Sequence, residues 1–269
     1  MRYILPVVCC VLLIVSCKDD KKTGEKDKTN ELPGYVKDMQ ERLKKSPDST
    51  GLRLRLVDAY DSLGMFKEGI AQVDSVLKRD STNNAVWMRK GMLLEKAKDT
   101  SGAIYAYARS INIYPAVDAQ LYLANLYAER KSDTALLLVN AVARQIFDNR
   151  TLAECDFIAG IYHARKGNTK MAEQLFDRCI TQDLKFMEAY IEKGLLYFDQ
   201  KKFPEALKIF QTAGTVEPSY ADAFYYQARC MEALGRTQEA IHMYEQSLRL
   251  DPGLKESSDA LTRLGVQVS

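Results

Sequence analysis

The hydrophobic and polar positions divide the chain into three parts. Residues 4–15 form an almost unbroken apolar run, and residues 18–30 contain no apolar side chain. From about residue 33 onward, small, aromatic and proline positions recur with a constant step of 34 residues, as at Pro218 and Pro252. A fixed period of this length is typical of stacked two-helix units, each of which buries its apolar face against its neighbours. The pattern predicts an all-α chain built by repetition.

Three further sets of positions keep the 34-residue step. They are Gly160, Gly194 and Ala228; Ala172, Ala206 and Ala240; and Phe176, Phe210 and Tyr244. Small residues allow two helices to cross closely, aromatic residues fill the gaps between helices, and proline ends a helix. A random amphipathic bundle would repeat its apolar stripe without keeping these positions in phase. The pattern therefore predicts a solenoid of helical hairpins.

These positions resemble the tetratricopeptide repeat (TPR). The unit 187–220 has the fullest match, with Tyr190, Gly194, Tyr197, Ala206, Phe210, Ala213 and Pro218. The resemblance implies an all-α TPR helical-hairpin solenoid, a right-handed superhelix, over residues 33–254. Its units are expected at 50–83, 84–117, 118–152, 153–186, 187–220 and 221–254. The segment 118–152 is the least regular, and we expect a register shift of about one residue there.

Both ends of the array are expected to carry incomplete units. Residues 33–49 are interpreted as a half-unit that contributes one helix. Residues 255–269 are interpreted as a C-terminal capping helix, with Ala260, Leu261 and Leu264 facing inward. Such caps are needed because a terminal repeat has a neighbour on one side only.

The apolar run near the N-terminus predicts a targeting signal. It follows Arg2 and is shorter than the roughly 20 residues of a spanning helix, which is typical of a secretory signal. It ends Ile14-Val15-Ser16-Cys17, which resembles the bacterial lipobox. The resemblance implies a signal peptide at 1–16, lipidation of Cys17 and a flexible polar tether at 17–32. The alternative is an ordinary signal peptide with a chance cysteine.

The residues after Cys17 indicate in which membrane the lipid-anchored protein is expected. Lys18 differs from the Asp of inner-membrane retention signals in enterobacterial lipoproteins. A lysine followed by two acidic residues resembles the surface-export signal of Bacteroidota lipoproteins. We therefore expect a lipid anchor in the outer membrane of a bacterial cell envelope, with the choice between periplasmic and surface-facing orientation left open.

The composition and the motifs argue against nucleic-acid binding, metal binding and catalysis. Lys plus Arg is 38 and Asp plus Glu is 36, and the resulting net charge of +2 is too small to favour nucleic-acid binding through charge. Three cysteines, Cys155, Cys179 and Cys230, follow the expected signal peptide and lipidation site. They are widely spaced and odd in number, which indicates neither a disulfide framework nor a metal site. His163 and His242 belong to no metal-binding motif, and no phosphate-binding or catalytic motif occurs. We expect no enzyme activity, no cofactor and no metal.

The TPR resemblance also implies a binding groove formed by the first helix of each unit. Groove positions 5 and 9 lie one helical turn apart, so they share a face. Groove positions 5, 9, 12 and 13 of the family are transferred to the units of this chain. The candidate groove residues are Leu54, Met88, Met92, Leu121, Asn125, Phe157, Ile161, Arg165, Ile191, Leu195, Phe198, Tyr225 and Arg229. These residues are mostly apolar, unlike the carboxylate clamp of chaperone-binding TPR proteins. They suit an amphipathic helix or an extended apolar peptide, with Arg165 and Arg229 orienting it.

Two functions are consistent with these features. The first is a non-catalytic scaffold or adaptor at the outer membrane, which binds a helix or peptide of an envelope protein. At the level of lipobox plus TPR array, the chain resembles type IV pilus pilotins, the TPR lipoprotein of the barrel-assembly machine and the TPR scaffold lipoprotein of murein hydrolases. The resemblance does not choose among these groups. The second is a surface lipoprotein that captures an extracellular peptide or glycan. The groove residues could instead pack on the chain's own helices, on its C-terminal cap or in a homodimer.

Overall fold

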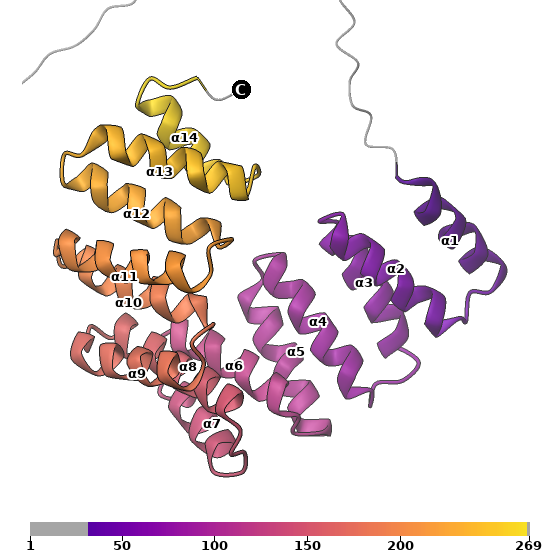
Figure 1. Cartoon of the computed structure of the whole chain (residues 1–269). Coiled ribbons are helices and arrows are strands. Elements are labelled where there is room, and N and C mark those ends of the chain that lie inside the picture. Colours follow the sequence, from indigo (N-terminus) through magenta and orange to yellow (C-terminus); the bar gives the residue numbers. More distant parts are fainter. Residues whose placement is uncertain (1–31, 268–269) are drawn as a thin grey trace, which may run out of the picture.

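The computed structural model describes residues 32–267, which form 14 α-helices and no strand within that range. The helices are arranged as antiparallel hairpins stacked side by side (Figure 1). The first hairpin pairs α2 (Thr50–Ser62) with α3 (Phe66–Leu77), and the second pairs α4 (Asn84–Lys96) with α5 (Thr100–Ile113). The predicted all-α solenoid is confirmed. The expected signal peptide, Cys17 and nearly all of the expected tether lie outside the described residues.

The same hairpin recurs four more times along the chain. These hairpins are α6 (Val117–Glu129) with α7 (Thr134–Ala143), α8 (Asn149–Arg165) with α9 (Thr169–Gln182), α10 (Met187–Asp199) with α11 (Phe203–Val216), and α12 (Ala221–Ala233) with α13 (Thr237–Leu250). At the two ends, α1 (Gly34–Lys45) packs on α2, and α14 (Lys255–Arg263) packs on α13. The face made by α2, α4, α6, α8, α10 and α12 is called the first-helix face below.

The small and aromatic positions of the sequence pattern meet inside the hairpins. A Cβ atom built on Gly91 would lie 2.5 Å from Cε1 of Tyr107, and one on Gly160 would lie 2.5 Å from Cε1 of Phe176. Both rings are fully buried. A glycine therefore stands where the ring of the second helix touches the backbone of the first, which explains why the two positions recur in phase.

The third hairpin (α6–α7) and the fourth (α8–α9) depart from the expected boundaries. Helix α8 begins at Asn149, four residues before the expected unit start at 153, and α6 begins at Val117 rather than 118. The cause at α8 is local, because the Asp148 side chain accepts a hydrogen bond from the Thr151 backbone N–H at 2.9 Å and caps the helix early. Helix α8 thus has 17 residues, whereas the other five first helices have 13.

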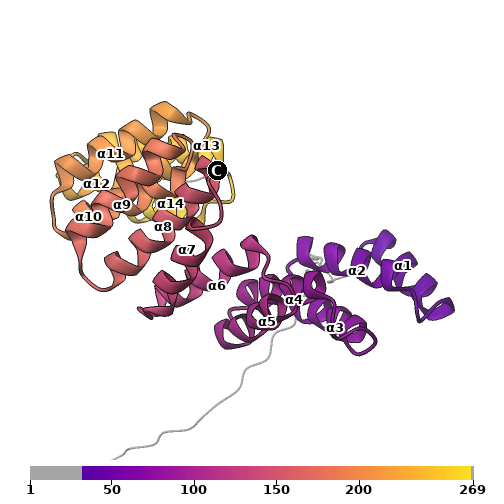
Figure 2. The same ribbon diagram turned by 90° about the horizontal axis from the view of Figure 1, so that it is seen from below.

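The array bends at this irregular hairpin. Helix α7 has only 10 residues, and α6 packs directly against α8 as well as against α7. Figure 2 shows that the hairpins before α6 and those after α7 form two stacks that run in different directions. The stack is nevertheless continuous, since each hairpin contacts the next one along the chain.

The three cysteines of the array are free and buried. Burial raises the pKa of the Cys155 thiol to about 11 and that of Cys230 to about 12, and it raises the pKa of Cys179 as well. Thiols of this kind are poor nucleophiles near neutral pH. These three cysteines therefore serve as small core residues of the hairpins.

Candidate functional site

Three hollows on the first-helix face contain nine of the thirteen predicted groove residues. The N-terminal hollow, of about 440 Å³, contains Leu54, Met88 and Met92. The middle hollow, of about 810 Å³, contains Leu121, Asn125 and Phe157. The C-terminal hollow, of about 640 Å³, contains Phe198, Tyr225 and Arg229. The structure thus brings the residues together in three groups, separated along the array.

Three predicted groove residues, Ile161, Ile191 and Leu121, are too buried to offer a binding surface. Ile161 is 2% exposed and Ile191 is 8% exposed, so neither presents a surface to a ligand. Ile161 packs in a core cluster with Leu121, because α6 and α8 lie directly against each other. Ile191 packs in the core of the C-terminal hairpins, where Leu195 is also partly buried. Leu121 borders the middle hollow but is itself buried, so it contributes little surface there.

Arg165 was expected to orient a ligand, and the structure corrects that role. Its Nε donates to Oε2 of Glu129 at 2.8 Å, and its Nη1 donates to Oε2 of Glu192 at 3.1 Å. The hydrogen bonds to Glu129, followed by those to Glu192, raise the pKa of the guanidinium above its usual range. Since its charge is matched by two carboxylates, Arg165 fastens α6, α8 and α10 to one another.

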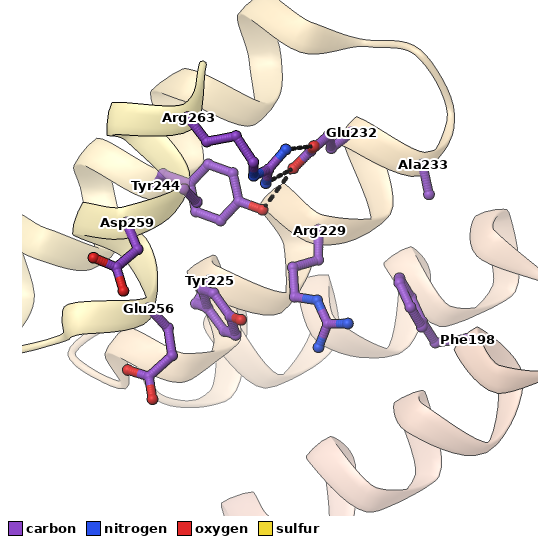
Figure 3. Close-up of a pocket in the computed structure, with 10 residues that line it drawn as sticks. Phe198, Tyr225, Arg229, Glu232, Ala233, Tyr244, Glu256, Asp259 and Arg263 are labelled. Atoms are coloured by element: carbon purple, nitrogen blue, oxygen red, sulfur yellow. Dashed lines mark hydrogen bonds and ion pairs between the residues drawn. The ribbon is translucent and has the colours of Figure 1, made fainter. Parts of the chain in front are cut away.

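The C-terminal hollow is built around the side chain of Arg229 (Figure 3). The guanidinium carbon lies 4.7 Å from the ring centroid of Phe198 and 5.8 Å from that of Tyr225. Such cation–π contacts hold the guanidinium group against the faces of the two rings. The rings of Phe198 and Tyr225 are therefore already stacked by the protein itself, which leaves less of their faces for a sugar ring.

The opposite wall of the C-terminal hollow is ionic. Glu232 accepts hydrogen bonds from Nη2 of Arg263 at 2.9 Å and from the Tyr244 hydroxyl at 3.0 Å. The bond to Arg263 is the main reason why the pKa of Glu232 is lowered. Glu256 and Asp259 of α14 complete this wall, as Figure 3 shows. The capping helix thus contributes to a hollow that the sequence had assigned to first helices alone.

The middle hollow combines aromatic rings with carboxylates. Its rings are Tyr122 from α6, Phe157 from α8 and Phe186 from the loop before α10. Phe157 and Phe186 pack with their centroids 4.9 Å apart. Its acidic side chains include Asp118 and Glu188. An aromatic floor with an acidic rim can bind a side chain that is apolar along its stem and cationic at its tip.

Sequence reasoning missed these acidic residues, although a signal for them was present. Glu154 and Glu188 are the second residues of units that begin at 153 and 187, and Asp118 is the second residue of a unit that begins at Val117. The TPR resemblance implies a groove position at the second residue as well, but the candidate residues are named only at the fifth, ninth, twelfth and thirteenth positions. The second residue points to the same face, one turn before the fifth and sixth.

No helix within residues 32–267 is long and apolar enough to cross a membrane. In the same range, no group of three or more His, Cys, Asp or Glu side chains is placed to hold a metal ion.

Comparison with known proteins identifies the repeat. The tetratricopeptide repeat family model matches residues 54–118, 157–215 and 191–255, which together make up more than half of the chain. The protein O-mannosyl-transferase TMTC3 of Homo sapiens is 22% identical over 193 residues, covering 66% of this chain and 21% of that protein. The corresponding protein of Mus musculus is 23% identical over 165 residues, covering 56% and 18%. The chain spans about a fifth of the length of these relatives.

Solved structures share the fold at low identity. A tetratricopeptide repeat protein from Parabacteroides merdae matches with a TM-score of 0.70 and 15% identity, covering 84% of this chain and 90% of that one. PilW, a widely conserved type IV pilus biogenesis factor, matches with a TM-score of 0.61 and 16% identity, covering 79% and 98%. At these identities the similarity concerns the fold alone.

Proposed function

Because the chain belongs to the tetratricopeptide repeat family, we propose that it is a non-catalytic scaffold that binds a segment of a partner protein on its first-helix face. The observation that carries this proposal is the row of three hollows on that face, each of which exposes apolar or aromatic side chains. Concave surface lined by apolar and aromatic side chains is typical of binding sites on folded proteins. The TPR fold itself points to protein–protein interaction rather than to catalysis.

We propose further that a lipid on Cys17 anchors this scaffold at the outer membrane of a bacterial envelope, and that its partner is an envelope protein. Support comes from the sequence Ile14-Val15-Ser16-Cys17 after a short apolar run, and from the polar residues that follow. Several acyl chains give stable anchoring where a single chain does not, since each buried CH₂ contributes about 0.8 kcal/mol.

The anchor is tested by the substitution Cys17→Ala. We expect it to move the protein from the membrane pellet to the soluble fraction of broken cells, because no acyl chain can then be attached. Quantitative blotting of both fractions after an alkaline wash measures the shift. Cys10→Ala, which removes a cysteine from the apolar run, serves as the matched control and should stay with the membrane. A Cys17→Ala protein that still resists the wash would contradict lipid anchoring.

The docking face is tested by site-specific photocrosslinking in intact cells. A benzoylphenylalanine placed at Met88 or Tyr122, on the first-helix face, is expected to capture one defined envelope protein. The same group at Tyr105, which is exposed on the second helix α5, should not capture that protein. Mass spectrometry of the crosslinked bands identifies the product. Equal capture from Tyr105 would exclude the first-helix face, and a band at twice the chain mass would identify a second copy as the occupant.

A further inference from the structure

Charge distinguishes the middle hollow from the other two hollows. Its lining holds four acidic and two basic side chains, namely Asp118, Glu154, Asp183, Glu188, Arg150 and Lys185. The two basic groups are already engaged, since Nε of Arg150 lies 3.6 Å from Oε1 of Glu154 and Nζ of Lys185 lies 3.8 Å from Oε2 of Glu217. Glu217 stands outside the hollow. Arg150 offsets one carboxylate of the hollow, and with four acidic against two basic side chains the hollow stays negative.

Two of its carboxylates have no partner of their own. Within the described part of the chain, the side-chain carboxylates of Asp118 and Glu188 form neither a hydrogen bond nor an ion pair, and both line the hollow. Glu154 is half-buried beside them. Burial raises the pKa of Glu154, and the nearby carboxylates of Asp118 and Asp148 raise it further, against the opposing effect of Arg150. A cation arriving from outside would relieve this repulsion.

The acidic residues continue along the array beyond the hollow. Asp118, Glu154, Glu188 and Asp222 each come from a different first helix, in α6, α8, α10 and α12. Acidic residues in a first helical turn are favoured by the helix dipole, but Glu154 lies in the second turn of α8, where that effect has faded. The dipole accounts for Asp118, Glu188 and Asp222, which lie in first turns, but not for Glu154.

The floor of the hollow is aromatic and fixed in place. Tyr122 is 41% exposed, and its ring stacks on that of Tyr107 at a centroid distance of 5.5 Å. Phe157 and Phe186 pack against each other beside it. The floor can bury an aliphatic or aromatic side chain, and its ring faces attract a Lys or Arg side chain that passes over them.

We propose that the middle hollow docks a polypeptide segment of the partner that places Lys or Arg side chains next to an aliphatic or aromatic one. The inference rests on the proposed scaffold function and specifies the chemistry of its partner. A purely apolar segment would bury Asp118 and Glu188 without a partner, which is costly, and an acidic segment would be repelled. A basic and apolar segment satisfies both the rim and the floor.

Two labelled peptides test the charge preference on the purified full-length chain. Both have twelve residues, one alternating Lys with Leu and the other alternating Glu with Leu. Fluorescence anisotropy is expected to show saturable binding of the Lys–Leu peptide and none of the Glu–Leu peptide. The neutral variant Asp118→Asn with Glu188→Gln is expected to weaken the Lys–Leu affinity about 10-fold, since two charge pairs are lost. Raising the salt from 50 to 300 mM should weaken it too, through screening.

A matched variant separates specific docking from general attraction. Glu68→Gln with Glu205→Gln removes the same charge from exposed positions in the first turns of α3 and α11, away from the first-helix face. It should leave the affinity within about 2-fold. Equal weakening by both variants, equal binding of both peptides, or no binding of the Lys–Leu peptide would each overturn the proposal. In all three cases the photocrosslinks from Met88 and Tyr122 report independently on whether the scaffold function stands.

Discussion

Replacement of Phe210 by alanine is expected to destabilise the C-terminal hairpins by about 3–5 kcal/mol. The ring is fully buried in the cluster that contains Ala206 and Ala228, and it stacks on Tyr226 at a centroid distance of 5.1 Å. It also lies against the backbone at Gly194, where the first helix of its hairpin leaves room for it. Its removal leaves a cavity that two crossing helices cannot close, so both the transfer energy and the packing energy are lost.

Chemical unfolding followed by circular dichroism measures this effect, and hydrogen exchange locates it. Since each hairpin is stabilised mainly by its neighbours, exchange should accelerate more in α10–α13 than in α2–α5. Phe147→Ala is the control, because Phe147 is 82% exposed and its loss should change the stability by less than about 0.5 kcal/mol. A loss below about 1 kcal/mol for Phe210→Ala would contradict the packing described here.

Replacement of Gly160 by leucine is expected to destabilise the α8–α9 hairpin by about 3 kcal/mol. The new Cβ would lie 2.5 Å from Cε1 and 2.8 Å from Cδ1 of Phe176, a fully buried ring that cannot swing into solvent. The two helices must then separate, which also disturbs the contact of α8 with α6. The higher intrinsic helix propensity of leucine recovers less than about 1 kcal/mol of this.

The steric origin of that loss is tested by a double-mutant cycle. In a Phe176→Ala background, Gly160→Leu should be clearly less destabilising, because the ring it meets is gone. Gly51→Leu is the control, since a Cβ on Gly51 meets no atom within 4 Å, and its stability should be unchanged or slightly higher. Identical costs of Gly160→Leu in both backgrounds would show that the ring contact is not the cause. The free energy of unfolding from urea titration is the quantity compared.

The candidate site was only partly predictable from the sequence. Met88 and Met92 on α4 and Phe157 on α8 border hollows, whereas Ile191, on a helix with the expected boundaries, is buried in the core. The prediction that Ile161 lines the groove was wrong, because α6 and α8 approach each other closely and bury this position between them. The role predicted for Arg165 was wrong for a different reason. Its carboxylate partners lie on α6 and α10, and the repeat positions do not specify how close these helices come to Arg165.

The sequence by itself determined the all-α hairpins, their order and the pairing of small with aromatic positions. Those features depend on contacts within one hairpin or between adjacent hairpins. The residues that make such contacts recur every 34 residues, so they can be recognised in the sequence. Only the tertiary structure decided the bend at α6–α8, the early start of α8 and the separation of the groove into three hollows. These depend on the angle and spacing between hairpins, which many side chains determine together and a single helix cap such as Asp148 can change.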